Sequence, residues 1–243
     1  MINVWWLGSS VGRGNFGDIL TPFILQHFEI DYNWVSHYSK ADLICVGSIA
    51  RRASKKTTVL GSGIISNNDR LDTSADWKFV RGPLTRKRLI ELGGDCPEIY
   101  GDPGLLLPLI YNPSITKQYD IGYVPHNVDF LEIEKDYEHV IGLKTRNYKT
   151  VIDKMLQCKR IVSSSLHGII AAHAYGIPAA WVKPNNALKG DHVKFHDYFA
   201  SVGITNYERS TYNDPIFIEP GKFDSTQLQE IFISLSQDLK NCN

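Results

Sequence analysis

Short runs of apolar residues, most of them ending near glycine or serine, alternate along this chain with longer segments of helical pattern. Compact apolar runs of this length are typical of strands buried in a parallel sheet. Strands are expected at residues 2–7, 41–46, 57–60, 77–80, 121–124, 139–143, 161–162 and 179–182. Helices are expected at residues 18–28, 83–92, 148–158, 166–176, 193–202 and 226–239. The alternation predicts an α/β fold of parallel sheets with helices on both faces.

This alternation occurs twice, on either side of a polar stretch at residues 112–119. We therefore predict two Rossmann-like domains, residues 1–118 and residues 119–243, with that stretch as their linker. Ligands of parallel sheets bind beyond the carboxyl ends of the strands, which is where this sequence places many glycines and serines. The pattern thus predicts a ligand-binding cleft between the two domains.

The segment from Arg160 to Pro178 is the most informative stretch of the chain. Three serines, Ser163–Ser165, lead from a strand into an apolar helix whose first turn contains His167 and Gly168. Serine before an apolar run is an N-cap signal, and the free N–H groups and dipole of a helix N-terminus attract phosphate or carboxylate. A histidine at such a site can donate a proton. The alternative is a histidine that only caps a buried helix.

The composition of the chain argues against several classes of protein. The 243 residues include 26 Lys+Arg and 26 Asp+Glu, so no overall charge attracts nucleic acid or an anionic membrane. No segment approaches the ~18 uninterrupted apolar residues of a membrane span, and the first residues are typical of a strand rather than a signal peptide. The four cysteines lack a C-x-x-C pair, and no residues have metal-ligand spacing. We expect a cytoplasmic protein without a metal or other cofactor.

A glycine-rich loop after the first expected strand contains a literal G-x-G-x-x-G, residues 12–17. As a dinucleotide fingerprint the match is poor, because its first glycine lies several residues beyond the strand. The acid expected further along is also misplaced, since Asp42 opens a strand instead of closing one. We favour a loop that presents Asn15 and Asp18 to a polar ligand.

Other candidate residues lie at the ends of expected strands. Arg81 precedes a helix, where its planar guanidinium could clamp a carboxylate or a phosphate. Asp102 lies in a Gly-Asp-Pro-Gly turn, where it faces the cleft or only stabilises its own loop as an Asx turn. His126 follows a proline at a strand end and also points to the cleft.

Several segments, taken in order over most of the chain, resemble the polysaccharide pyruvyl transferase family. They are Asn15-Phe16-Gly17-Asp18, Gly61-Ser62-Gly63, the Arg81 junction, Gly101-Asp102-Pro103, Ile121–His126, and Ser163–Gly168 followed by Ala171–Pro178. The N-terminal N-F-G-D-I-L-T-P is most similar to the branch that includes the succinoglycan ketal-forming enzymes.

This resemblance implies a fold like that of the GT-B glycosyltransferases, and leaves open whether the last helix crosses back to the first domain. It implies transfer of pyruvate from phosphoenolpyruvate to a sugar of a bacterial surface or exported polysaccharide, or of its lipid-linked precursor. The products would be a cyclic pyruvate ketal and phosphate. The first domain would bind the acceptor and the second phosphoenolpyruvate.

Specific roles follow from the same resemblance. The residues expected to bind phosphoenolpyruvate are Ser164, Ser165, Leu166, Gly168 and Arg81. His167 is the expected acid, held protonated by the neighbouring anion, and Arg81 the expected anion clamp. The residues expected to contact the acceptor are Asn15, Asp18, Gly63, Asp102 and His126.

The chain departs from the family pattern at two places. Ser165 stands where an arginine is common, and Gly82-Pro83 replace an acidic residue that often follows the arginine matching Arg81. Two alternatives therefore stay open: a glycosyltransferase that places the diphosphate of a nucleotide sugar on the same helix terminus, and a catalytically silent glycan-binding relative. A lipid-linked acceptor would bring the protein to the inner face of a membrane, and the sequence does not fix the oligomeric state.

Overall fold

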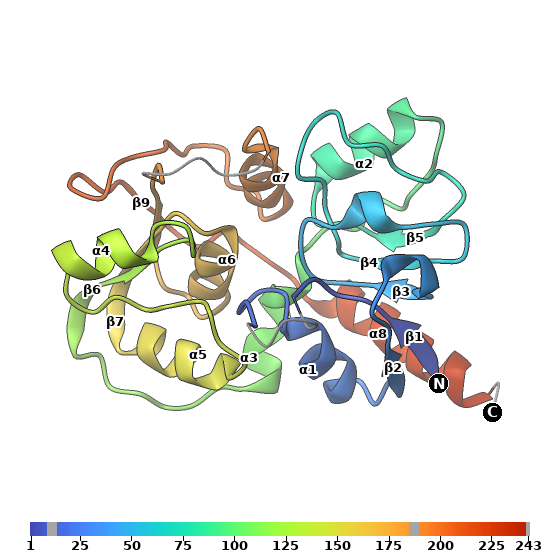
Figure 1. Ribbon diagram of the computed structural model, residues 1–243, viewed down its shortest axis with the longest axis horizontal. Helices are drawn as coiled ribbons and strands as arrows, with labels where there is room; N and C mark the ends of the chain where they lie inside the picture. Colours follow the sequence, from blue (N-terminus) through green and yellow to red (C-terminus); the bar gives the residue numbers. More distant parts are fainter. Residues whose placement is uncertain (9–13, 185–189, 242–243) are drawn as a thin grey trace.

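The structure is a computed structural model and describes residues 1–8, 14–184 and 190–241. Its strands form two sheets, one in each half of the molecule (Figure 1). Gly12, the first glycine of the literal G-x-G-x-x-G match, lies outside the described residues. The α/β class predicted from the sequence is correct.

The first sheet has five strands, all parallel, in the order β2-β1-β3-β4-β5. Their bounds are β1 Ile2–Val4, β2 Tyr32–Trp34, β3 Leu43–Ile44, β4 Thr58–Leu60 and β5 Asp76–Phe79. The sequence pattern did not predict β2, because this edge strand is half-exposed or exposed at every position and carries no apolar run.

The second sheet has the order β6-β7-β8-β9, with bounds β6 Tyr119–Val124, β7 Cys158–Ser163, β8 Ala179–Trp181 and β9 Phe217–Ile218. Strands β6, β7 and β8 are parallel, but β9 is antiparallel to β8, so the prediction of purely parallel sheets is wrong at this edge. A strand of two residues leaves no periodic signal in the sequence. The run at residues 139–143 forms only a single bridge, between Val140 and Tyr123.

Helices pack around both sheets. Their bounds are α1 Leu20–His27, α2 Pro83–Glu91, α3 Leu107–Ile110, α4 Phe130–Asp136, α5 Tyr148–Leu156, α6 Leu166–Ala174, α7 Val193–Ser201 and α8 Thr226–Asn241. The described residues also form three short 3₁₀ helices, η1 Tyr38–Lys40, η2 Ala50–Arg52 and η3 Pro103–Leu106. Among the described residues, no helix has both the length and the apolar character needed to cross a membrane.

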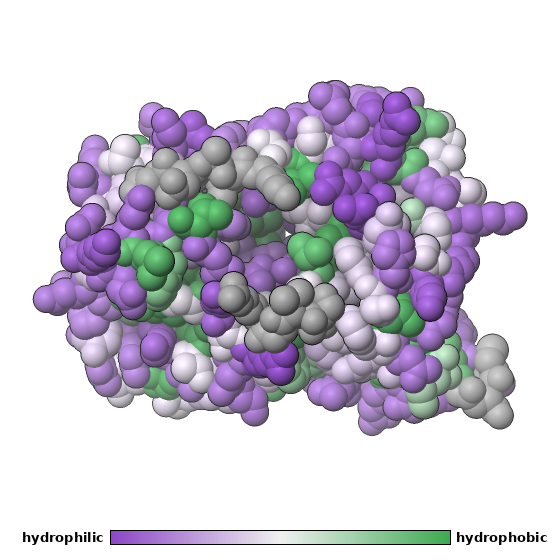
Figure 2. Space-filling model, viewed as in Figure 1, coloured by the Kyte–Doolittle hydropathy of each residue, from purple (hydrophilic) through white to green (hydrophobic). Residues whose placement is uncertain are grey.

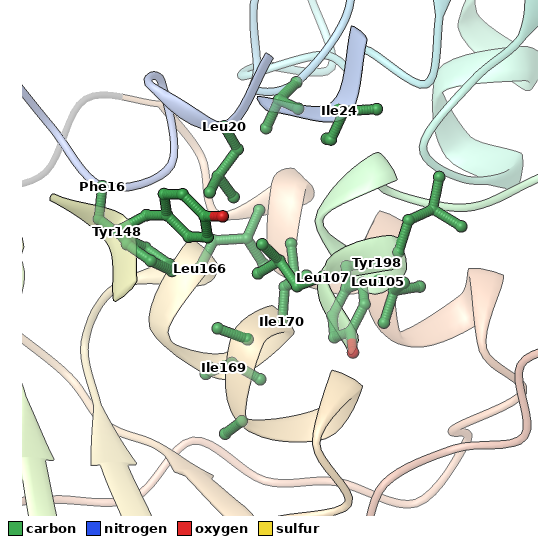
Figure 3. Packing of buried hydrophobic residues seen from close by; sticks show 14 of the residues in the cluster. Phe16, Leu20, Ile24, Leu105, Leu107, Tyr148, Leu166, Ile169, Ile170 and Tyr198 are labelled. Atoms are coloured by element: carbon green, nitrogen blue, oxygen red, sulfur yellow. The ribbon is translucent and has the colours of Figure 1, made fainter. Parts of the chain in front are cut away.

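Helix α6 lies at the centre of the largest core cluster, as its apolar sequence predicts. Ile169 and Ile170 are buried, and they pack with Leu105 and Leu107 of the η3–α3 segment and with Leu20 of α1 (Figure 3). The same cluster includes residues from strands of both sheets. Because one continuous core joins the two halves, the N-terminus of α6 is held at the boundary between them.

Helix α8 returns from the second sheet to the first (Figure 1). Phe232 stacks on Phe28 with 4.8 Å between ring centroids and meets Phe79 of β5 edge-on. The hydroxyl of Ser236 donates to the backbone oxygen of Glu29 at 3.2 Å. The end of the chain is therefore packed against the half in which the chain begins.

A buried ion pair also joins the two halves. Arg81, which follows β5, and Asp197 of α7 are both fully buried, and their side chains are linked by Nε–Oδ2 and Nη2–Oδ2 contacts of 3.0 and 2.9 Å. The carboxylate of Asp197 also accepts the backbone N–H and the hydroxyl of Thr85, in the first turn of α2, at 2.9 and 2.7 Å. Helix α2 has no side-chain cap of its own, so Asp197 caps it from the other half.

We expect Asp197→Asn to lower the free energy of unfolding by about 3–5 kcal/mol, because the substitution leaves the guanidinium of Arg81 buried without a counter-charge. Urea denaturation followed by circular dichroism measures the change. The matched control is Asp31→Asn at an exposed position, which is expected to change stability by less than about 0.5 kcal/mol. Equal stability of the two variants would show that the ion pair does not hold the halves together.

Candidate functional site

A cavity of about 140 Å³ lies between the two halves. Its walls come from the segments that follow β1, β3, β4, β6 and β7, which are the carboxyl ends of strands in both sheets. The lining residues are Leu7, Asn15, Asp18, Ser48, Ile49, Ile65, His126, Asn127, Leu143, Ser165, Leu166, His167 and Lys194. Figure 2 shows the surface hollowed between the left and right halves of the molecule, with hydrophilic side chains in the hollow.

The N-terminus of α6 forms one wall of this cavity. The hydroxyl of Ser163 donates to the backbone oxygen of Val124 and accepts the N–H of Ser165, at 2.6 and 3.0 Å, which fixes the turn that starts the helix. The N–H of Ile169 donates to the oxygen of Ser165 at 3.2 Å. The N–H groups of the three residues before Ile169 therefore belong to the first turn, where a helix can bind an anion.

His167 extends from this first turn against the glycine-rich loop of the other half. A Cβ atom at Gly17 would lie 1.9 Å from Nδ1 of His167, so only glycine allows the imidazole to pack there. Its Nε2 atom is buried, yet it has no hydrogen-bond partner among the described residues. A buried polar atom of this kind calls for an explanation, and a ligand in the adjoining cavity would supply the partner.

The structure indicates the protonation state of His167 in the absence of a ligand. Burial, together with the positive charges of Lys194 and Arg81, lowers the pKa of His167 to about 3. The imidazole is therefore neutral near pH 7 in the protein without a ligand. An anion bound between His167 and these cations would raise the pKa again.

Lys194, in the first turn of α7, is the one cationic residue among those that line the cavity in the described part of the chain. Burial and the charge of Arg81 lower its pKa to about 8, and nearby Asp18 opposes this shift. The sequence does not single out Lys194, because one lysine in a predicted helix carries no periodic or spacing signal. Its position facing His167 depends on the packing of α7 against α2.

Asn15 and Asp18, the two residues expected to contact a polar ligand, line the cavity from the first half of the chain. Asn15 donates its side-chain amide to Oδ2 of Asp18 at 2.8 Å, which orients the carboxylate. Burial raises the pKa of Asp18 to about 6, with the hydrogen bond from Asn15 acting in the opposite sense. A carboxylate with this pKa is mostly ionised at pH 7 and can accept a proton from a ligand.

Arg81 does not line the cavity. Its guanidinium is fully buried behind the wall and donates to Asp197, to the hydroxyl of Ser48 at 2.7 Å and to the backbone oxygen of Ile64 at 2.8 Å. Ser48, one of these partners, does line the cavity. A direct clamp on a ligand is thus not what the structure shows, because protein groups already engage most of the guanidinium N–H donors.

Three further predicted contacts also need correction. Ser164 is buried, and its hydroxyl contacts the N–H of His126 and the hydroxyl of Tyr212, both at 2.9 Å, so it supports the wall from behind. Gly63 lies under the guanidinium of Arg81, since a Cβ atom there would be 2.2 Å from Cζ. Asp102 is buried away from the cavity and caps η3 by accepting the N–H of Gly104 at 2.9 Å. The Asx-turn alternative for Asp102 therefore describes it better.

The remaining predicted residues lie at the cavity or next to it. Ser165, Leu166 and His126 line it, and burial with the charge of Lys194 lowers the pKa of His126. Gly168 is packed inward, because a Cβ atom there would lie 2.4 Å from the hydroxyl oxygen of Ser163. Gly168 therefore allows the first turn of α6 to pack closely and offers a ligand no exposed surface. Among the described residues, no group of three His, Cys, Asp or Glu side chains could hold a metal ion.

The cavity thus combines a helix N-terminus, one lysine, a neutral histidine and a carboxylate whose pKa is near neutral. The helix terminus and the lysine favour an anionic ligand. The histidine and the carboxylate can give and take protons. This combination suits proton-coupled group transfer from an anionic donor.

Comparisons with known proteins identify the family of this chain. The model of a family described as polysaccharide pyruvyl transferase matches residues 9–186. The uncharacterised protein L143 of Acanthamoeba polyphaga mimivirus is 35% identical over 178 residues, which cover 69% of this chain and 61% of that protein. The succinoglycan biosynthesis protein ExoV of Rhizobium meliloti is 28% identical over 210 residues, which cover 79% of this chain and 63% of that protein. The chain therefore spans less than two thirds of the length of either relative.

Among solved structures, a functionally uncharacterised protein of Klebsiella pneumoniae has a similar fold. The TM-score is 0.52 at 14% sequence identity, and the match covers 86% of this chain and 91% of that one. At this identity the likeness concerns the fold alone.

We expect the pKa of His167 to rise in Lys194→Met, because the substitution removes a positive charge that disfavours the imidazolium. Titration of the imidazole nitrogens by ¹⁵N NMR measures the midpoint in the ligand-free protein. In Lys87→Met, which removes an exposed lysine from α2, the midpoint should stay where it is in the unsubstituted protein. An unchanged midpoint in Lys194→Met would contradict the placement of the ammonium beside His167.

Proposed function

The chain belongs to the polysaccharide pyruvyl transferase family, and from this premise we propose that it transfers pyruvate from phosphoenolpyruvate to two hydroxyls of a sugar. The product would be a cyclic ketal on a polysaccharide or its precursor, with release of phosphate. The observation that carries the proposal is the buried, unpartnered Nε2 of His167, which faces a cavity shared with Lys194 and the N-terminus of α6.

The charges of the cavity support an anionic donor. Phosphoenolpyruvate carries a phosphate and a carboxylate, so its binding needs at least one cation and several hydrogen-bond donors. Lys194 supplies the cation, and the first turn of α6 supplies N–H groups. Arg81 adds positive charge from behind the wall, as its effect on the pKa values of His167 and Lys194 indicates.

Binding of the donor would set the protonation state of His167. Without a ligand, the imidazole stays neutral because charging it beside two cations in a buried site is costly. The anionic groups of phosphoenolpyruvate offset both cations, which raises the pKa of the imidazole and lets it take up a proton. His167 therefore becomes an acid only when the donor is in place.

The transfer then requires two proton acceptors and one donor. His167 gives its proton to the methylene carbon of phosphoenolpyruvate, which becomes a methyl group, while a sugar hydroxyl bonds to the adjacent carbon and loses its proton to Asp18. The bond to the phosphate oxygen breaks, and phosphate leaves. A second hydroxyl bonds to the same carbon and returns a proton to His167, which closes the ring. The proton on Asp18 passes to phosphate or water.

We also propose how the chain divides between the two substrates. Residues 1–118 would carry the acceptor side and residues 119–243 the donor side of a GT-B-like arrangement, with the cleft between them. Asp18 and Asn15 come from the first part, and His167 and Lys194 from the second. This division is supported by a cavity that draws its walls from both sheets.

We expect phosphoenolpyruvate to raise the melting temperature of the protein, since a ligand at 100 times its dissociation constant stabilises the folded state by about 2.7 kcal/mol. A thermal-shift titration beside a panel of nucleotide sugars measures this. The shift should be largely lost in Lys194→Met and kept in the surface control Lys87→Met. A shift with a nucleotide sugar alone would indicate a glycosyltransferase and overturn the proposal.

For the chemical step, we expect His167→Gln to lower phosphate release from phosphoenolpyruvate by about 10²-fold or more, because the proton donor is removed. The assay is phosphate release in the presence of the sugar acceptor that the protein pyruvylates. His27→Gln, at an exposed position of α1, is the matched control and should keep full turnover. Turnover near that of the unsubstituted protein in a folded His167→Gln variant would remove His167 from the mechanism.

A further inference from the structure

A second, wider cavity of about 620 Å³ lies in the second half of the molecule, outside the site described above. It opens between the end of α4, the segment after β8 and the loop that leads to β9. Its lining includes Asp136, Tyr137, Lys183, Thr211, Tyr212 and Asn213. We refer to this cavity as the tyrosine groove.

The tyrosine groove has a preorganised aromatic wall. The rings of Tyr123 and Tyr137 lie 4.4 Å apart, and those of Tyr137 and Tyr212 lie 5.9 Å apart, measured between centroids. The hydroxyl of Tyr137 donates to the side-chain oxygen of Asn213, which orients the amide. Rings that already pack against one another lose little conformational entropy when a ligand binds on them.

The charges of the groove argue against an anionic ligand. Its rim holds one cation, Lys183, and one carboxylate, Asp136. Helix α4 also carries Glu132, Glu134 and Lys135, none of which lines the groove. With one carboxylate for its one ammonium, the lining has no net positive charge to attract a phosphate, whereas a mixture of carboxylate, ammonium, amide and hydroxyl groups beside aromatic rings suits a neutral, hydroxyl-rich ligand such as a sugar.

The groove is also close to the candidate active site. Tyr212, in its wall, donates to the hydroxyl of Ser164 at 2.9 Å. The same hydroxyl accepts the N–H of His126, which lines the active-site cavity, also at 2.9 Å. Lys183 follows β8 and His126 follows β6, so both cavities lie at the carboxyl ends of the parallel strands of the second sheet.

We propose that the tyrosine groove is a subsite for an uncharged sugar residue of the acceptor glycan, neighbouring the residue that receives pyruvate, so that the acceptor extends from the side of residues 1–118 onto the surface of residues 119–243. This assignment rests on the proposed function in one respect, which is that the neighbouring sugar is the one that receives pyruvate. The groove would let the protein select an oligosaccharide over its single sugar units, because a monosaccharide in the active site leaves the groove empty.

The test begins with an array of bacterial surface oligosaccharides of defined sequence, applied to the unsubstituted protein. The best-bound oligosaccharide and its single sugar units are then titrated against Lys183→Ala and Asn213→Ala. Each substitution removes one hydrogen-bonding group and should weaken oligosaccharide binding about tenfold. Binding of the single units should not change. The matched controls are Lys87→Ala and Asn206→Ala, both at exposed positions outside the groove, which should bind as the unsubstituted protein does.

Hydrogen exchange gives a second readout, in which the oligosaccharide should protect residues 133–137 and 210–214. Unchanged affinity in both groove variants, protection elsewhere only, or no binding by any oligosaccharide of the array would overturn the proposal.

The phosphoenolpyruvate thermal shift, measured in the same variants, separates this result from the proposed function. If the protein does not bind phosphoenolpyruvate but binds the oligosaccharide through Lys183 and Asn213, the groove proposal stands and the proposed pyruvyl transfer is wrong. If phosphoenolpyruvate raises the melting temperature as expected and these two side chains do not contribute to oligosaccharide binding, the proposed function stands and the groove proposal is wrong.

Discussion

The buried ion pair between Arg81 and Asp197 is the interaction on which the arrangement of the site depends. It connects the end of β5 with α7, and the same carboxylate caps α2 through Thr85. Lys194 lies three residues before Asp197 on α7, so the pair that fixes this helix also fixes the ammonium that faces the cavity. Ser48, which accepts a bond from Arg81, ties the cavity wall to the same group.

Close approach at glycines makes this arrangement possible. The imidazole of His167 lies where a side chain at Gly17 would be, and the guanidinium of Arg81 lies over Gly63 in the same way. A Cβ atom at Gly82 would be 2.0 Å from the backbone oxygen of Asp197, so glycine lets α7 approach the start of α2. Because these positions are glycines, the imidazole of one half and the buried ion pair between the halves can pack directly against backbone. A larger residue at any of them would push the two halves apart.

The sequence by itself determined the α/β class, the order of most strands and helices, and the apolar α6 with His167 in its first turn. These features are local, because apolar runs, N-cap serines and terminal glycines act within a few residues of one another. The ordered motifs also indicated the family that the comparison with known proteins then showed. The edge strands β2 and β9 were not predicted. Strand β2 has no buried position, and β9 has only two residues, so neither leaves a periodic signal in the sequence.

Only the tertiary structure decided which side chains share the cavity. Lys194, Asp18 and His167 are far apart in sequence, and their meeting depends on packing between the two halves. Arg81 and Asp102 have the residue types and strand-end positions of ligand-binding groups, but the fold buries both, and neither lines the cavity. Burial and the placement of charges also set the pKa of His167, because desolvation and the approach of cations from remote parts of the sequence are properties of the folded chain and not of local sequence.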